Sequence, residues 1–485
     1  MIFIKNKYGI KFLRSQLGHK INSKFLGALI IPLILSIGII PAIPFSAGVD
    51  IPHLLPVCID KVWLESINGK IACVTPSTAE KLVERGWGTM LDEMMEDTSD
   101  EKSITPVISG GTLPITETPI IGNPEKEFPK NYVPGTEELA GNEIRLTFLG
   151  TGMPFPTRNQ AAAGVLMEFG NGDILMFDVG SGTVANFNSM KISPAYLTKF
   201  FITHLHTDHQ GDLDMFWAQG IPFGRILPMH VWGPTGEGHA LGTQAFVDGI
   251  LAANYWDLKS REGNIPTTGA EIVTHEFDWA ETQVVYDENG ITVTSFPAIH
   301  AMAGAVSYRI DWNGMSIVYS GDTKINNFMV EQGQNVDLLI HETFLPAEIL
   351  SEKTGMALEN ALVVVNEIHT PAKAAGVVFE LAQPKMAVMY HTWVTGETIT
   401  PIFDDLRIPY LGPVTLAQDF TVFNITPDSI VVRQALVDDA PWPIVPEEAA
   451  HAEKTDEVPV IPQWLLDQSI DIEEAIKEIL EKRHG

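Results

Sequence analysis

The sequence predicts an α/β layered domain between Glu143 and Val437. Short apolar segments with strand character recur through this region, and Gly and Pro residues separate them. Helical patterns, of which residues 371–382 give the clearest, lie between the later strands. The predicted strands are IRLTFLG, DILMFDVG, KFFIT, ITVTSF, VSYRI, SIVYS, VDLLI and KMAVMY. Because strands alternate with helices, we expect the strands to form sheets that helices cover.

The composition of the chain limits its partners. The 485 residues exceed one typical domain, and 31 Lys and Arg against 61 Asp and Glu give a formal net charge of −30. Nucleic-acid binding takes most of its affinity from cationic side chains that contact phosphates. We therefore expect no nucleic-acid partner.

Residues 1–48 have the pattern of an export signal. The first 49 residues contain six basic residues and no acidic one, and an uncharged apolar run extends from Phe25 to Gly48. The run is long enough to cross a bilayer, but three prolines interrupt it. Cleavage of the segment and its retention as a membrane anchor both remain open. Either way, the predicted location is periplasmic or extracellular.

Three further regions flank or precede the α/β domain. Residues 49–91 form a small module with Cys58 and Cys73, which are predicted either to form a disulfide or to remain two small buried thiols. Residues 92–141 are acidic and rich in Pro, a composition typical of a linker. Residues 438–485 form a Pro- and acid-rich tail that ends in an amphipathic helix.

The segment FFITHLHTDHQGDL carries the clearest chemical signal. It places His204, His206, Asp208 and His209 within six residues, directly after an apolar strand. Since a strand projects alternate side chains to one side, His204 and His206 can reach one metal ion, and the following turn carries Asp208 and His209 toward a second. A chance cluster on a solvated loop fits this context poorly.

Three more candidate ligands each follow an apolar strand. They are His300, Asp322 and His391. Because α/β folds assemble their sites in loops at one end of a sheet, we expect these residues to converge with the cluster. The expected arrangement has one metal ion on His204, His206 and His300, a second on Asp208, His209 and His391, and Asp322 as the bridge. Imidazole and carboxylate ligands suit zinc best and also accept manganese or iron.

This HxHxDH segment is the signature of the metallo-β-lactamase superfamily, which the chain resembles from residue 143 to 437. Within the superfamily the chain is most similar to ribonuclease Z and to the arylsulfatases of the same fold, and it also resembles metallo-hydrolases linked with guanitoxin biosynthesis. The matching segments are FLGTGMPFPTRN (148–159), FDVGSGT (177–183), VWGPTG (231–236), YSGDT (319–323), LLIHETF (338–344) and HTPAKAA (369–375). The resemblance implies an αββα sandwich with the metal ions, expected from the ligand types to be two zinc ions, at one edge. Residues 49–91 would be a small module appended to the N-terminal side of this fold.

The resemblance also implies a mechanism, in which a hydroxide held between two metal ions attacks the substrate. Asp208 would orient the attacking water as well as bind metal. His369 would donate a proton to the leaving oxygen, unless it is a capping or core residue before Pro371. His341 and Glu342 would lie behind the ligands and orient them.

The substrate expected from the sequence is a small ester, either an aryl sulfate or a phosphodiester. The alternative is a ribonuclease Z-like endoribonuclease. Only 21 residues separate His300 from Asp322, which leaves no room for the arm that grips transfer RNA in bacterial ribonuclease Z. A β-lactamase or lactonase and a metal-free binding scaffold are weaker alternatives. The zinc β-lactamases lack the bridging carboxylate, and a scaffold would not need all seven ligands.

Overall fold

The computed structural model describes residues 62–66, 71–74, 88–90, 120–262, 267–447 and 459–484. The chain divides into two compact units, Met1–Lys102 and Ser103–Gly485. In the first unit, three antiparallel strands pair in the order β2-β1-β3. They are β1 (Val62–Ser66), β2 (Ile71–Val74) and β3 (Gly88–Met90). The predicted signal segment and Cys58 lie outside the described residues, so the export signal and the disulfide stay predictions.

A ten-stranded sheet forms one half of the second unit. From one edge to the other its strands are β11 (Ile272–Phe277), β10 (Met229–Pro234), β9 (Lys199–Phe201), β8 (Ile174–Phe177), β7 (Gly164–Phe169), β6 (Ile144–Gly150), β19 (Thr421–Thr426), β20 (Ser429–Ala435) and β4 (Ile120–Gly122), with β5 (Asn131–Tyr132) also paired to β20. Strands β8 to β11 are parallel, and β6, β7, β19 and β20 are antiparallel.

A seven-stranded sheet forms the other half. Its strands, in spatial order, are β12 (Gln283–Glu288), β13 (Ile291–Pro297), β14 (Val306–Trp312), β15 (Met315–Tyr319), β16 (Leu338–Glu342), β17 (Met386–Tyr390) and β18 (Val414–Leu416). The order follows the sequence without exception. Strands β12 to β15 are antiparallel, and β15 to β18 are parallel. All eight predicted strands are present in the two sheets.

The two sheets share a core, and a second core lies under the helices that cover the ten-stranded sheet. Leu146 and Phe148 of β6 are in the core between the sheets. Leu166 of β7 and Met176 of β8 are in the core under the helices. Because both faces of the sheet are covered, these strands read as continuous apolar runs rather than as alternating ones.

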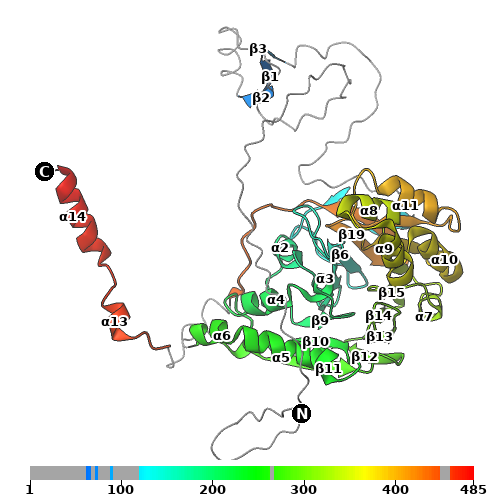
Figure 1. Cartoon of the computed structure of the whole chain (residues 1–485), viewed down its shortest axis with the longest axis horizontal. Coiled ribbons are helices and arrows are strands. Elements are labelled where there is room, and N and C mark those ends of the chain that lie inside the picture. The colour runs from blue at the N-terminus through cyan, green and yellow to red at the C-terminus, as the bar shows by residue number, and fades with distance from the viewer. Residues whose placement is uncertain are drawn as a thin grey trace, which may run out of the picture. The chain divides into compact units, whose positions relative to one another are not determined.

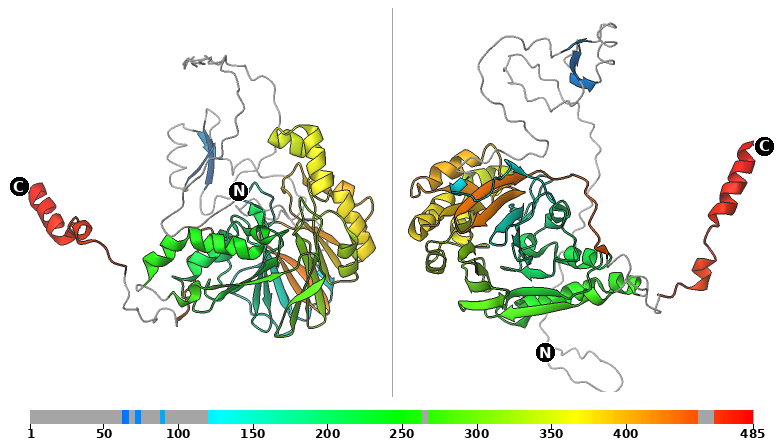
Figure 2. Two further views of the ribbon diagram at one scale, coloured as in Figure 1. Left: turned by 60° about the horizontal axis from the view of Figure 1, so that its bottom comes forward. Right: turned by 180° about the vertical axis from the view of Figure 1, so that it is seen from behind.

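Helices cover the outer face of each sheet, as Figures 1 and 2 show. Those that pack on the ten-stranded sheet are α2 (Thr183–Asn188), α4 (Leu213–Gly220) and α5 (Thr243–Ala253). Those that pack on the seven-stranded sheet are α7 (Asn327–Gln332), α10 (Ala372–Ala382) and α11 (Ile399–Leu406). Others are α3 (Thr207–Gln210), α6 (Tyr255–Arg261), α8 (Ala347–Thr354) and α9 (Leu358–Val363). The layers are therefore αββα, as predicted, and α10 occupies the predicted helical segment.

The start of this domain differs from the prediction. Strands β4 and β5 lie in the stretch 92–141 that composition assigned to a linker, and both pair with β20. Tyr132 is 1% exposed and joins the core under the helices. The proline-rich segment thus adds strands to one edge of the sheet, where Pro residues do not interrupt internal hydrogen bonding.

The tail contains two short helices, α13 (Gln463–Leu466) and α14 (Ile472–His484). The apolar face predicted for α14 is present, and Ile472, Ile476 and Ile479 on it are exposed. Among the described residues, no helix has both the length and the apolar character that a bilayer span requires.

Candidate metal centre

The predicted cluster sits where β9 ends. The chain leaves the sheet after Phe201, and His204 and His206 lie in the loop that leads to α3. The backbone of His206 is extended, with φ −65° and ψ 148°, and α3 begins directly after it. After this change from extended backbone to helix, Asp208 and His209 project from α3, and the ring centroids of His204 and His209 lie 4.1 Å apart.

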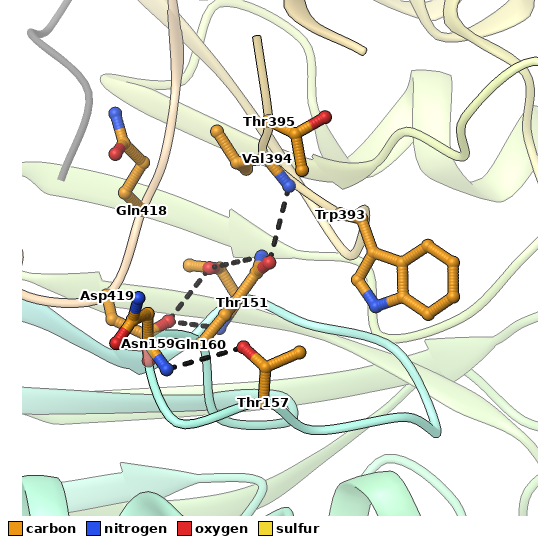
Figure 3. Close-up of a pocket in the computed structure, with 9 residues that line it drawn as sticks. All are labelled: Thr151, Thr157, Asn159, Gln160, Trp393, Val394, Thr395, Gln418 and Asp419. Atoms are coloured by element: carbon orange, nitrogen blue, oxygen red, sulfur yellow. Dashed lines mark hydrogen bonds between the residues drawn. The ribbon is translucent and has the colours of Figure 1, made fainter. Parts of the chain in front are cut away.

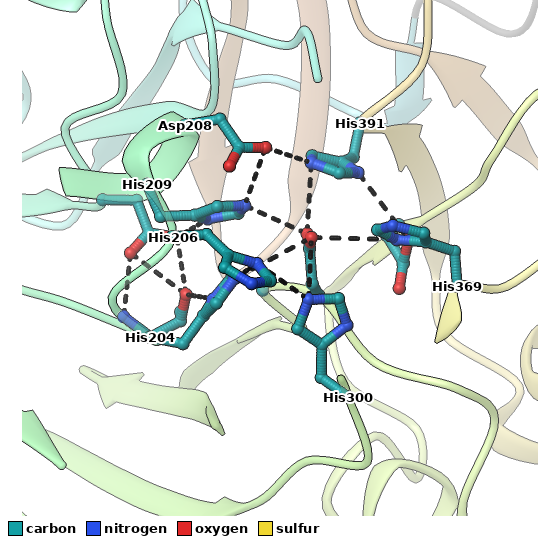
Figure 4. A network of polar contacts seen from close by, with 12 residues as sticks. His204, His206, Asp208, His209, His300, His369 and His391 are labelled. Atoms are coloured by element: carbon teal, nitrogen blue, oxygen red, sulfur yellow. Dashed lines mark hydrogen bonds and ion pairs between the residues drawn. The ribbon is translucent and has the colours of Figure 1, made fainter. Parts of the chain in front are cut away.

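The three candidate ligands that are distant from this cluster in sequence each follow a strand, and the three strands run in the same direction. His300 follows β13 and Asp322 follows β15, and both strands run antiparallel to β14. His391 follows β17, which is parallel to β15 through β16. The ends of these strands therefore deliver their ligands to one edge of the seven-stranded sheet. Figure 4 shows the labelled histidines and Asp208 converging there.

Three imidazoles form the first cluster. Nε2 of His204 lies 3.0 Å from Nδ1 of His206, and Nε2 of His300 lies 3.1 Å from the same atom. Two nitrogens bound to one tetrahedral zinc ion lie roughly 3.3 Å apart, given zinc–nitrogen distances of about 2.0 Å. The nitrogens thus already have nearly the spacing that one ion requires. The backbone fixes one ring, because Nδ1 of His300 lies 3.2 Å from the carbonyl oxygen of Ile368.

A carboxylate and two imidazoles form the second cluster. Oδ2 of Asp208 lies 3.2 Å from Nε2 of His391 and 3.6 Å from Nε2 of His209. All three side chains are buried. Burial alone would raise the pKa of Asp208, but the neighbouring imidazoles hold it below its usual value.

Asp322 stands between the two clusters and turns one oxygen to each. Its Oδ2 lies 3.9 Å from Nε2 of His204 and 3.6 Å from Nε2 of His300. Its Oδ1 lies 3.1 Å from Nε2 of His209 and 3.3 Å from Nε2 of His391. This division is what a carboxylate that bridges two ions requires, and it matches the arrangement predicted from the sequence.

Metal ions would satisfy the buried donor atoms of the centre better than these atoms satisfy one another. Nε2 of His209 and Oδ1 of Asp322 are both buried and lie 3.1 Å apart, yet neither atom makes a hydrogen bond. A buried polar atom that lacks a partner is costly, and a metal ion would satisfy both atoms at once. The groups whose donor atoms all lie within 4.8 Å of one another include His204, His206, His300 and Asp322 as one set, and Asp208, His209, Asp322 and His391 as another.

Electrostatic interactions in the centre follow from this crowding. Although burial opposes a charge on His391, the charge of Asp322 and hydrogen bonds from His391 to the carboxylates of Asp208 and Glu342 raise its pKa to about 10. Asp322, Asp178 and Asp208 likewise raise the pKa of His209 well above its usual value, against the effect of burial. The pKa of Asp322 is well below its usual value because the surrounding imidazoles outweigh desolvation. Without metal, protons on His209 and His391 balance the buried carboxylates.

His369 lies at the rim of the centre. Its Nδ1 is 2.9 Å from Oε2 of Glu342 and 3.7 Å from Oδ2 of Asp322. The ring of Phe344 stacks on it, with centroids 4.2 Å apart and planes 12° apart. Asp322, Glu342, His369 and His391 also bring donor atoms close enough to hold a metal ion. The structure thus places His369 at the rim of the centre, and its role as proton donor stays a prediction.

The two residues predicted to orient ligands have different positions. Glu342 contacts His369 and also accepts a hydrogen bond of 2.6 Å from the backbone N–H of Thr323, beside Asp322. The ring of His341 instead faces Phe379, and its Nδ1 lies 2.7 Å from the carbonyl oxygen of Glu342. The prediction for His341 is therefore corrected. The side chains of a strand alternate between faces, so His341 points away from the centre.

Asp178 supports the centre and was not among the predicted site residues. It accepts hydrogen bonds from Nδ1 of His209 at 2.8 Å, from the hydroxyl of Tyr319 at 2.9 Å and from the backbone N–H of Thr203 at 2.8 Å. The sequence did contain a signal, because Asp178 follows the apolar strand β8 just as the predicted ligands follow theirs. Two residues on, Gly180 allows close packing, since a Cβ there would lie 2.0 Å from the carbonyl oxygen of Asp208.

Comparisons with known proteins find relatives that are similar in sequence. The family model of the anti-Pycsar protein Apyc1 matches residues 144–354. A ribonuclease Z from Mycobacterium avium is 26% identical over 253 residues, which cover 51% of this chain and 85% of that protein. A ribonuclease Z from Methanosarcina acetivorans is 25% identical over 317 residues, covering 58% of this chain and 98% of that protein.

Among solved structures, the metallo-β-lactamase fold protein YhfI from Bacillus subtilis aligns with a TM-score of 0.44 at 17% identity, covering 59% of this chain and 100% of that one. The identification rests on the sequence relatives, the HxHxDH segment and the two ligand clusters. This chain is a metallo-hydrolase of the metallo-β-lactamase fold with ribonuclease Z-like relatives.

Proposed function

We propose that this chain hydrolyses phosphodiester bonds at a centre of two metal ions. The observation that carries the proposal is the position of Asp322, whose two oxygens face two separate sets of nitrogen and oxygen donors. The donor set suits zinc best, with manganese or iron as alternatives. Two bound ions would supply positive charge for the phosphate oxygens and would lower the pKa of a nearby water.

The side chains of this protein have distinct tasks in the proposed reaction. Asp208 accepts a proton from the attacking water and orients it, because its carboxylate borders the centre beside His209 and His391. His369 carries a proton for the leaving oxygen at the opposite rim. Glu342 holds the ring of His369 in place through Nδ1, which leaves Nε2 available to the substrate.

The ribonuclease Z relatives favour RNA as the substrate class. They support the ribonuclease alternative better than they support hydrolysis of an aryl sulfate. A phosphodiester is common to both the ribonuclease alternative and the small-ester prediction. We therefore propose ribonuclease Z-type cleavage of RNA as the first candidate activity.

Hydrolysis of a small phosphodiester is the second candidate, and two observations favour it. The formal net charge of −30 repels a polyanion, whereas a small substrate needs only local neutralisation by the metal ions. The apolar segment from Phe25 to Gly48 also has the pattern of an export signal, and we propose on this basis that the protein is exported. An exported enzyme would rarely encounter precursor transfer RNA.

One side-by-side assay distinguishes these activities. Metal-loaded full-length protein is given precursor transfer RNA, bis(p-nitrophenyl) phosphate and p-nitrophenyl sulfate, with Asp322→Ala as the matched inactive control. Site-specific cleavage at the 3′ trailer would support the first candidate. Hydrolysis of the phosphate diester without RNA cleavage would support the second. Hydrolysis of the sulfate alone would overturn the phosphodiester proposal.

A further inference from the structure

A pocket of about 260 Å³ lies where the loop after β6 meets the loop after β17. Figure 3 shows the indole of Trp393 on one side of it, with hydroxyl and amide groups nearby. The volume is below the roughly 300–1,000 Å³ of pockets that enclose a whole drug-sized ligand. The pocket therefore suits one ring of a larger substrate.

The pocket lies beside the metal centre because one of its walls continues from a candidate ligand. Trp393 is two residues after His391, and consecutive Cα atoms are about 3.8 Å apart, so their backbones lie within about 7.6 Å of each other. The intervening Thr392 donates its backbone N–H to the carbonyl oxygen of Thr151 at 3.2 Å. This short separation is the basis for placing in the pocket a ring that neighbours a phosphate at the metal centre.

Hydrogen bonds hold the two walls of the pocket together. Nε2 of Gln160 donates to the carbonyl oxygen of Thr392 at 2.7 Å and to Oγ1 of Thr151 at 3.1 Å. Oε1 of Gln160 accepts from the backbone N–H of Val394 at 3.3 Å. Because these bonds exist before any ligand binds, the pocket is preorganised and little ordering entropy is lost on binding.

The lining of the pocket is uncharged except for the carboxyl group of Asp419, whose oxygens already accept hydrogen bonds. None of the nine lining residues is Lys, Arg or His. The buried Asp419 accepts hydrogen bonds from Thr151, Ala161 and Asn186, with the shortest at 2.6 Å from the backbone N–H of Ala161. Burial raises the pKa of Asp419 to about 7. A phosphate or sulfate group would find no cation here, so the pocket favours a neutral group.

Two side chains are available to such a group. The indole of Trp393 is half-buried, and Phe155 supports it with ring centroids 5.8 Å apart. Within the described part of the chain, the side-chain amide of Asn159 makes no hydrogen bond, although its backbone N–H donates to Thr157. An aromatic face and a free amide in the lining of one pocket offer stacking together with one donor and one acceptor. A nucleobase is a neutral planar ring with matching groups on its edge.

We propose that this pocket binds the nucleobase next to the scissile phosphate, with Trp393 as the stacking surface and Asn159 as the hydrogen-bonding partner. This proposal rests on the proposed phosphodiester hydrolysis and names the class of its substrate as nucleotide esters. It applies both to RNA and to small nucleotides, because the pocket would bind only one base of either substrate.

The test compares phosphodiesters that share a leaving group and differ in the base. The probes are the p-nitrophenyl esters of adenosine and uridine 5′-monophosphate, with methyl p-nitrophenyl phosphate as the base-free reference. We expect wild-type kcat/KM for at least one nucleotide ester to exceed the reference by tenfold or more. Trp393→Ala should reduce this ratio by roughly tenfold, the scale of one lost base stack, and Trp393→Phe should retain most of it. Asn159→Ala should reduce it by a smaller factor.

The controls separate failure of this inference from failure of the proposed function. Trp442→Ala changes a tryptophan that is 87% exposed and outside the pocket, and it should leave the ratio unchanged. Hydrolysis of all the esters with a ratio unaffected by Trp393→Ala would overturn the nucleobase pocket alone. If no ester is hydrolysed, calorimetric binding of adenosine and uridine 5′-monophosphate decides the pocket, and the proposed function itself fails only if precursor transfer RNA is not cleaved either. Wild-type binding that weakens at least tenfold in Trp393→Ala supports it, and equal or absent binding overturns it.

Discussion

Glu342 and His369 form a pair at the rim of the candidate metal centre, with Oε2 of Glu342 2.9 Å from Nδ1 of His369. Because the carboxylate engages Nδ1, the ring presents Nε2 to any substrate that occupies the centre. Phe344, stacked on the same ring, prevents it from rotating. The pair thus holds Nε2 of His369 at a fixed position, as the proposed proton transfer to the leaving oxygen requires.

Replacing His369 should therefore affect substrates according to their leaving groups. We expect His369→Ala to slow phosphodiesters with alkyl leaving groups by roughly 10²- to 10⁴-fold, because these groups need a proton as they depart. Esters of p-nitrophenol need no such proton and should be nearly unaffected. Steady-state kinetics with a series of leaving groups measure the difference. Glu342→Gln should change the series in the same direction but less, whereas an equal loss on every substrate would indicate a structural role.

Replacing the bridging carboxylate should reduce metal content and activity together. Metal-replete protein is expected to hold close to two ions per chain, measured by elemental analysis. Asp322→Ala should lose at least one ion and all measurable hydrolysis, since both clusters face this side chain. Folding can be checked by circular dichroism. Full activity with one ion or none would contradict a centre of two metal ions.

Metal affinity should increase with pH because protons and metal ions compete for the same nitrogens. The pKa of His391 is raised to about 10 in the metal-free centre, so a proton must leave before this ring can bind metal. We expect apparent zinc affinity, measured by competition with a chelator, to rise from pH 6.5 toward pH 10. His391→Asn should flatten this dependence, and replacing the exposed His239 with Ala should not alter it. A wild-type affinity that is constant over this range would contradict the prediction.

The same pKa predicts how the stability of metal-free protein varies with pH. A raised pKa means that the charged His391 stabilises the fold below its ordinary pKa of about 6.5, and that this contribution is lost as pH rises through about 10. The free energy of unfolding should fall over that range by at most about 1.4 kcal/mol per pH unit for this one proton. Denaturant unfolding of metal-free protein measures the fall, and metal-loaded protein should not show it.

Removing the support behind His209 should weaken metal binding without removing a ligand. Asp178→Ala deletes the carboxylate that orients this ring and is expected to reduce metal affinity by roughly 10- to 100-fold. Asp178 has a φ of 53°, a conformation that Asn tolerates better than Ala, so Asp178→Asn isolates the loss of charge from the backbone effect. Unchanged affinity in both variants would show that His209 needs no such support.

The sequence pattern by itself determined that the domain is a layered α/β domain, and it identified the candidate ligands. Both were predicted from apolar strands that are followed directly by His or Asp residues. Such residues lie in loops at the edge of a sheet, where α/β folds commonly place their functional sites. His204, His206 and His209 needed no tertiary information. Composition misjudged the stretch before Glu143, since the strand pairing of β4 and β5 depends on β20, about 300 residues away in the sequence.

Only the tertiary structure decided how distant residues meet. It placed each oxygen of Asp322 on its own cluster. It also showed that Glu342, and not its neighbour His341, faces the centre, because alternation along a strand puts the two on opposite faces without saying which face meets the centre. The pocket beside Trp393 likewise arises between two loops that are far apart in sequence. The physical reason is that local patterns fix periodicity and burial, whereas contacts between loops depend on how the two sheets pack, which no local pattern encodes.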